Sequence, residues 1–187
     1  MKLRALAAIG VMAVLTVACA GDGNRITYTE HSNFYSPQLV QYVSNKGYFP
    51  LTMHGAPFGP EGNGKIAQNL RLPGYYKSVP FKEVSGQSSD DLGRLVLLMD
   101  AGGIVNGSKL CHDLDKLALN GNQGEKLQIQ ASFCYQDEMV SHAVLTTLRP
   151  KSADDPDFQR GMRQLTEDLF RTQLPEGPGC SAAGGSC

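Results

Sequence analysis

The feature that most constrains the fold is a β-hairpin that the sequence predicts over residues 126–148. Its first half alternates apolar and polar side chains, which is the period of a strand buried on one face. The apolar positions are Leu127, Ile129, Ala131, Phe133 and Tyr135, and the polar positions are Gln128, Gln130, Ser132, Cys134 and Gln136. Asp137 and Glu138 then form the expected turn into a second strand.

The length of this turn decides which face each later side chain occupies. A turn of two or four residues pairs Tyr135 with Val140 and Phe133 with His142, which places His142 on the core side. A turn of three residues moves every later side chain to the other face. In the first register His142 is expected to be a buried histidine with satisfied nitrogens rather than a catalytic base.

A second constraint is the segment Leu95-Val96-Leu97-Leu98-Met99, which is apolar without alternation. A run of this kind suits a strand buried on both faces, so we expect it at the centre of the sheet beside the hairpin. The second face of the sheet then needs a cover. Asp100, at the end of this strand, is interpreted as a turn residue before two glycines.

The remaining elements are shorter. Strands are expected at residues 25–30, at an edge, at residues 48–54 and around residues 80–84. Helices are expected from Ser36-Pro37, from Lys65, and from Asp154 or Asp155 before Pro156. The fold class is therefore α+β: one disulfide-stapled domain over residues 26–175, with a mostly antiparallel sheet of four to six strands and two or three helices.

The N-terminal segment reads as a targeting signal. Lys2 and Arg4 precede an apolar run that is shorter than the roughly 20 residues needed to span a bilayer. The run ends in Leu15-Thr16-Val17-Ala18-Cys19, which resembles the lipobox of bacterial lipoproteins, although Thr16 occupies the position where leucine is commonest. An ordinary secretory signal cleaved near Ala20, or a misassigned start codon, is the alternative interpretation.

The resemblance implies that residues 1–18 are removed and that Cys19 carries the lipid, palmitate included. Residues 19–25 then form a lipidated spacer. Ala20 follows the cysteine, and by the sorting rule of that family the absence of aspartate there implies the outer membrane, at its periplasmic face. The mature chain carries a net charge of −3, and no run of like charges exceeds a pair, which argues against nucleic acid as a partner.

The chain has five cysteines, an odd number, and lipidation of Cys19 leaves four that can form disulfides. The four others fall by position into Cys111 with Cys134 and Cys180 with Cys187, and the sequence leaves other pairings open. Cys134 lies on the polar side of the predicted hairpin and Cys111 in a polar loop, so both are better placed if they are joined. The tail, residues 176–187, is rich in glycine and serine and is expected to be flexible.

Two motifs resemble chemical sites. Gly59-Pro60-Glu61-Gly62-Asn63-Gly64-Lys65 has the spacing of a phosphate-binding loop, but Ile66 stands where serine or threonine would hold magnesium. We therefore interpret it as a turn before a helix and expect no nucleotide. Cys111-His112-Asp113 and Asp115 contain metal-ligating residue types, but a disulfide at Cys111 removes the thiolate, so no metal is expected.

No catalytic constellation emerges, and His31 and His54 fall in irregular segments. The predicted function is that of an outer-membrane-anchored lipoprotein without a cofactor. It would act as a structural, assembly or accessory subunit of an envelope protein complex. The alternatives are a small periplasmic enzyme with a site near Asp100, His112 or His54, and a carrier of a lipid or small ligand.

Overall fold

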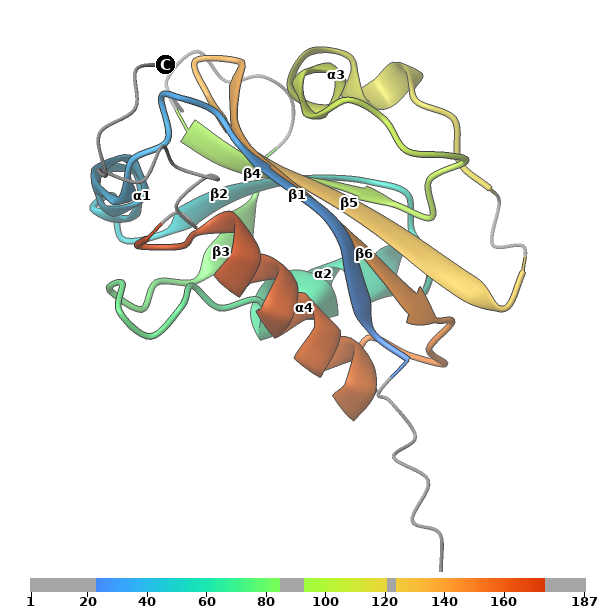
Figure 1. Ribbon diagram of the computed structural model, residues 1–187. Coiled ribbons are helices and arrows are strands. Elements are labelled where there is room, and N and C mark those ends of the chain that lie inside the picture. The colour runs from blue at the N-terminus through green and yellow to red at the C-terminus, as the bar shows by residue number, and fades with distance from the viewer. Residues whose placement is uncertain (1–22, 85–92, 121–123, 174–187) are drawn as a thin grey trace, which may run out of the picture.

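The computed structural model describes residues 23–84, 93–120 and 124–173, which form a six-stranded sheet with helices on both faces (Figure 1). The strands are β1 (Arg25–His31), β2 (Phe49–His54), β3 (Phe81–Glu83), β4 (Gly93–Met99), β5 (Lys126–Tyr135) and β6 (Glu138–Leu148), in the order β1-β6-β5-β4-β2-β3. The helices are α1 (Pro37–Ser44), α2 (Pro60–Asn69), α3 (Gly107–His112) and α4 (Pro156–Leu169), with a 3-10 turn η1 (Leu114–Lys116). The predicted α+β class is confirmed.

Strand direction corrects the sequence analysis. The sheet is mixed rather than mostly antiparallel, because β2 runs parallel to both β3 and β4. The crossover helix α2 joins β2 to β3, and such a connection returns the chain in the same direction. The described chain also has four α-helices where two or three were expected, since the segment around Cys111 forms a helix of its own.

The central strand is confirmed. Every residue of β4 is buried, and its side chains alternate between two hydrophobic clusters. Leu95, Leu97 and Met99 join the main core under α1, α2 and α4. Val96 and Leu98 join a second core under α3 and η1. The second core consists of Val96, Leu98, Ala101, Leu110, Cys111, Leu114 and Cys134.

Two of the predicted helix starts are confirmed by their caps. The Ser36 hydroxyl accepts from the Gln38 amide at 3.2 Å, and the Asp155 carboxylate accepts from the Asp157 amide at 2.9 Å. The start at Lys65 is wrong, because α2 already begins at Pro60. The phosphate-loop-like segment is therefore mostly helical.

The hairpin forms, but its turn and register differ from the first expectation. Gln136 and Asp137 form the turn, both with positive φ, and Asp137 accepts from Arg94 at 2.8 Å. Cys134 pairs with Met139 and Phe133 with Ser141, so β6 carries one extra residue at Val140. This bulge moves His142 to the α3 face, opposite Ser132, as the three-residue turn would have done.

The edge position predicted for the first strand is confirmed, and the opposite edge is formed by the strand expected around residues 80–84. β1 is an edge strand, and β3 is a three-residue strand at the opposite edge. Pro50 lies at the second position of β2, where its missing N–H costs no pairing with β4. Within the described ranges, no helix is long and apolar enough to cross a lipid bilayer.

Candidate functional site

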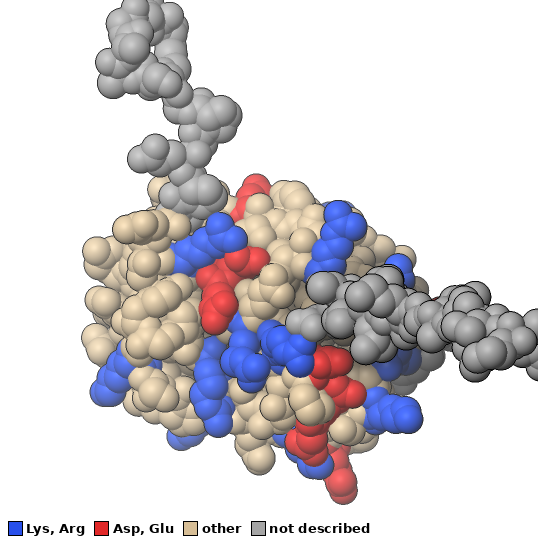
Figure 2. Space-filling view, turned by 60° about the horizontal axis from the view of Figure 1, so that its bottom comes forward, with Lys and Arg blue, Asp and Glu red and all other residues tan. Residues whose placement is uncertain are grey.

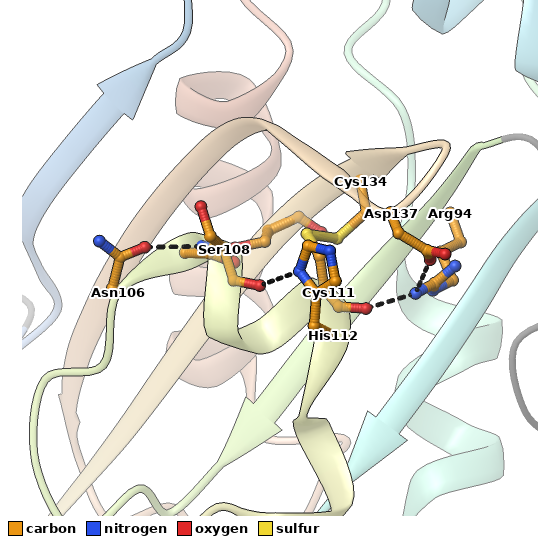
Figure 3. Close-up of a disulfide and its surroundings, with 9 residues drawn as sticks. Arg94, Asn106, Ser108, Cys111, His112, Cys134 and Asp137 are labelled. Carbon is orange, nitrogen blue, oxygen red and sulfur yellow. Dashed lines mark hydrogen bonds and ion pairs between the residues drawn. A yellow bond between two sulfur atoms is a disulfide. The ribbon is translucent and has the colours of Figure 1, made fainter.

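The predicted bridge between Cys111 and Cys134 is present and fastens α3 to β5, with a Cα–Cα distance of 5.7 Å (Figure 3). Further bonds hold the helix at both ends. Asn106 caps its start by accepting from the Ser108 amide at 2.8 Å, and Arg94 donates to the Cys111 carbonyl at 2.7 Å. The polar helix that the sequence suggested as a loop is therefore a fixed cover over the second core.

His142 lies beneath the first turn of α3. It is 1% exposed, and neither ring nitrogen has a hydrogen-bond partner among the described residues. Burial lowers its pKa to about 4, and the Glu30 carboxylate opposes this shift only weakly. Gly107 packs so closely on the ring that a Cβ there would lie 2.8 Å from the His142 Cβ. Two predictions for His142 are thus wrong: that it faces the main core, and that its ring nitrogens are hydrogen-bonded.

A cleft of about 180 Å³ opens beside α3 and η1. Its floor includes Thr52 from β2 and Arg94 from β4, and its walls come from the segment between Leu110 and Lys116. Arg94 is 6% exposed, and its Nη2 donates to both Cys111 and Asp137. The Thr52 hydroxyl is buried without a partner in the described part of the chain. These groups offer hydrogen bonds to a small polar ligand.

The residues proposed as possible metal ligands have other roles. Cys111 is in the disulfide, and His112 donates from Nδ1 to the Ser108 carbonyl at 2.9 Å. Asp113 pairs with Lys116 at 2.7 Å, a contact that lowers the pKa of its carboxyl. In the described ranges, no three His, Cys, Asp or Glu side chains gather as a metal site would require.

The phosphate-loop-like segment has helical geometry instead of a cradle. Gly59 precedes the first turn of α2, and the Gly62 amide donates to the Gly59 carbonyl at 3.1 Å. Gly62 is needed because a Cβ there would lie 2.5 Å from that of Phe58. Lys65 donates to Asp154 at 2.7 Å. Its amine is therefore paired with a carboxylate, whereas a phosphate-binding lysine points at its ligand.

Asp100 follows a strand, and His31 and His54 each end one, so the irregular segments expected for the two histidines are wrong. Asp100 has a left-handed backbone (φ 62) after β4, and its buried carboxylate accepts from Arg149 at 2.8 Å. His54 donates from Nε2 to the Leu117 carbonyl at 3.1 Å. His31 stacks edge-on against Tyr35, with its pKa lowered chiefly by burial. Asp100 and His54 each make a polar contact within the fold, whereas the buried Nε2 of His31 has no hydrogen-bond partner among the described residues.

An apolar groove of about 360 Å³ lies where the β1–α1 loop, α1 and the hairpin tip meet, and the sequence analysis missed it. Its lining residues are Phe34, Leu39, Tyr135, Gln136, Glu138 and Val140. Phe34 is 74% exposed, and Tyr42, which stacks edge-on against Tyr135, is 52% exposed. Aromatic side chains gathered at an exposed groove mark protein-binding surfaces. In the sequence, the groove could have been suspected from Phe34-Tyr35, two adjacent aromatic residues outside the predicted helices and strands.

The face that carries α2 and α4 is charged, unlike the apolar groove. Figure 2 shows Lys and Arg interspersed with Asp and Glu on the side that carries α2 and α4. On α4, Arg160 forms an ion pair with Asp157 at 2.7 Å. A nucleic-acid surface needs a continuous basic stripe, which this face does not have.

Three of the sequence-predicted residues, Cys19, Cys180 and Cys187, lie outside the described residues. The fold and its sites define an α+β protein with a mixed six-stranded sheet, a helix stapled across one face and an apolar groove at one end. Comparison with protein families, with curated proteins and with solved structures finds no match to this chain. Function is therefore argued from the chemistry of the sites themselves.

Proposed function

We propose that the protein is a lipoprotein anchored through Cys19 at the periplasmic face of the outer membrane, where it acts as a structural, assembly or accessory subunit of an envelope protein complex. It works by binding rather than by catalysis. The observation that carries this proposal is the apolar groove, because Phe34 leaves about three quarters of its surface in water. An exposed aromatic side chain beside an apolar groove is a suitable anchor for a partner protein.

The anchor rests on the lipobox-type sequence, and the disulfide supports export, since such bridges persist in oxidising compartments. Palmitate labelling tests the anchor directly. The wild type should incorporate label and fractionate with outer membranes, and Cys19→Ser should do neither. If the wild type incorporates no palmitate, the lipid anchor is contradicted and the protein would be secreted without one.

A photo-crosslinking residue placed at position 34 tests the binding role in intact cells. It should yield a discrete adduct with an envelope protein, whereas the same group at Ile104 should not. Ile104 is a matched control because it is 67% exposed and lies outside the groove. Equal adducts at both positions, or none at position 34, would contradict a role for the groove.

A second candidate function, binding of a small polar ligand, is favoured by the cleft beside α3. The buried Arg94 guanidinium can donate to an oxyanion, and so can the Thr52 hydroxyl, which has no partner among the residues that the structure describes. The cleft has room for only a small molecule, which favours this over a lipid.

A further inference from the structure

We infer that the partner is an extended protein segment that adds a strand to the free edge of β1 and inserts an apolar side chain into the groove. This inference rests on the proposed function and specifies how the partner is recognised. Two separate features support it: an open sheet edge, and an apolar groove where that edge ends. Strand addition uses main-chain hydrogen bonds for affinity and side-chain pockets for specificity.

The backbone of β1 shows which groups face outward. The Ser32 amide donates to the Val140 carbonyl at 2.9 Å, so Ser32 faces β6. Antiparallel pairing alternates this direction along a strand, and Glu30 therefore also faces β6. Thr29 and His31 then direct their N–H and C=O groups away from the sheet. Within the described residues, β1 pairs only with β6.

An irregularity in β1 sets the length of the usable edge. The pairing with β6 shifts between Ile26 and Tyr28, which disrupts the edge around Thr27. Regular pairing resumes from Tyr28 onward and continues through Ser32. The segment open to an added strand is therefore residues 28–32, the half of β1 closest to the groove.

This irregularity also decides between two occupants. A second copy of β1 in a symmetric antiparallel pair would place Arg25 opposite Glu30, a favourable charge match. However, the centre of that pair would be Thr27 and Tyr28, where the edge is irregular. A symmetric pair confined to residues 28–32 would be centred on Glu30 and would place two carboxylates opposite each other, which is unfavourable. A different protein can use the regular half without this repulsion. We therefore assign the site to a partner of different sequence.

The groove lies at the end of β1 that follows Ser32. Phe34 is two residues beyond Ser32, and Val140, which bonds to Ser32, lines the groove from β6. At about 3.4 Å per residue, an added strand of five residues spans residues 28–32. The chain then turns, because the Tyr35 amide donates to the Ser32 carbonyl at 3.0 Å, and this turn carries Phe34. We place the terminal side chain of the added strand against Phe34.

The charges beside the edge specify the partner's composition. Glu30 is exposed on the strand, and Glu138 lies at the groove. The recognised segment should therefore combine an aromatic or branched aliphatic anchor with a lysine or arginine near it. Pairing through the backbone leaves its other positions free to vary.

A random library of linear twelve-residue peptides, screened against the full-length protein in detergent solution, tests the inference. Enriched peptides should carry an apolar anchor and a basic residue. Thr29→Pro removes an outward N–H, and Phe34→Ala removes the groove's exposed wall, so each should weaken binding at least tenfold. The matched controls Thr29→Val and Ile104→Ala should bind within twofold of the wild type.

A second measurement leaves the protein unchanged, in case Thr29→Pro does not fold. Two versions of an enriched peptide would be made, one with methyl groups on the odd-numbered backbone nitrogens and one with them on the even-numbered nitrogens. One version should lose binding and the other should keep it, because only alternate N–H groups of an added strand face β1. Binding should also slow hydrogen exchange at the Thr29 and His31 amides.

Three outcomes would overturn the inference: no enriched peptide, binding that tolerates both methylation patterns, or a concentration-dependent homodimer that Thr29→Pro disrupts. The last outcome would assign the edge to a second copy. If the crosslinker at position 34 captures a partner and peptide binding ignores Thr29→Pro, only the strand-addition inference fails. If the crosslinker captures nothing, the proposed function fails.

Discussion

At the scale of single residues, His142 is the most unusual side chain in the described structure. A buried imidazole normally finds a hydrogen-bond partner, because leaving a polar group unpaired costs about 1–3 kcal/mol. His142 has none among residues 23–84, 93–120 and 124–173, and Gly107 closes the space above the ring. The consequence is that the folded protein strongly prefers the neutral ring.

This preference predicts a pH-dependent stability. The pKa of His142 is about 4 in the folded protein and about 6.5 unfolded, so the unfolded chain binds a proton first as pH falls. Between pH 7 and pH 5 this one group should remove about 2 kcal/mol of stability. His142→Phe should flatten that part of the profile. Urea unfolding of both proteins at the two pH values measures the difference, and parallel profiles would contradict the assignment.

At the scale of elements, α3 is a six-residue helix that cannot be stable alone. Its own apolar contribution to the second core is small, and it is held there by the Cys111–Cys134 bridge and by the bond from Arg94. The bridge closes a loop with a sequence separation of 23 residues. The tether therefore supplies much of the stability of this cover.

Removing the bridge should destabilise the protein by about 3 kcal/mol in the chain-entropy description. The double variant Cys111→Ala and Cys134→Ala tests this by urea unfolding. Hydrogen exchange should accelerate more in α3 than in α4, whose apolar face lies in the main core. Wild-type protein under a strong reductant should behave like the variant. A loss below 1 kcal/mol would show that α3 docks without its tether.

The elements also show what sequence can predict. The strand at residues 95–99 was predictable because a continuous apolar run has few other stable environments. The bridge was predictable because each cysteine was poorly placed alone. The start of α2 was not, because Gly62 and Gly64 disfavour a helix by roughly 1 kcal/mol each, and the close contact with Phe58 that needs Gly62 exists only in the fold.

The position of His142 and the groove were not predictable for a related reason. One extra residue at Val140 reverses the face of all that follows, and a local pattern cannot reveal a bulge. The exposure of Phe34 depends on how α1 and the hairpin tip approach each other. Both features arise from contacts between distant segments.

At the scale of the whole molecule, both hydrophobic clusters consist of residues between Tyr35 and Phe170. Because Cys111 and Cys134 are joined, the tail cysteines have no cysteine partner within residues 23–173. We therefore expect the described residues to fold without the tail.

Deleting residues 174–187 should leave the urea midpoint of unfolding unchanged, within about 0.5 kcal/mol in free energy, as expected for a segment rich in glycine and serine. The comparison is with the full-length protein under oxidising conditions. A larger loss would mean that the tail contributes to the folded domain.

The pairing of β1 with β6 has a consequence for how the protein is made. Arg25, near the start of the chain, pairs with Thr146, near its end, so this contact closes the longest loop in the sheet. β1 cannot take its place until β6 has been synthesised. Docking of β1 is therefore a late step of folding, because it completes the sheet only after β6 is in place.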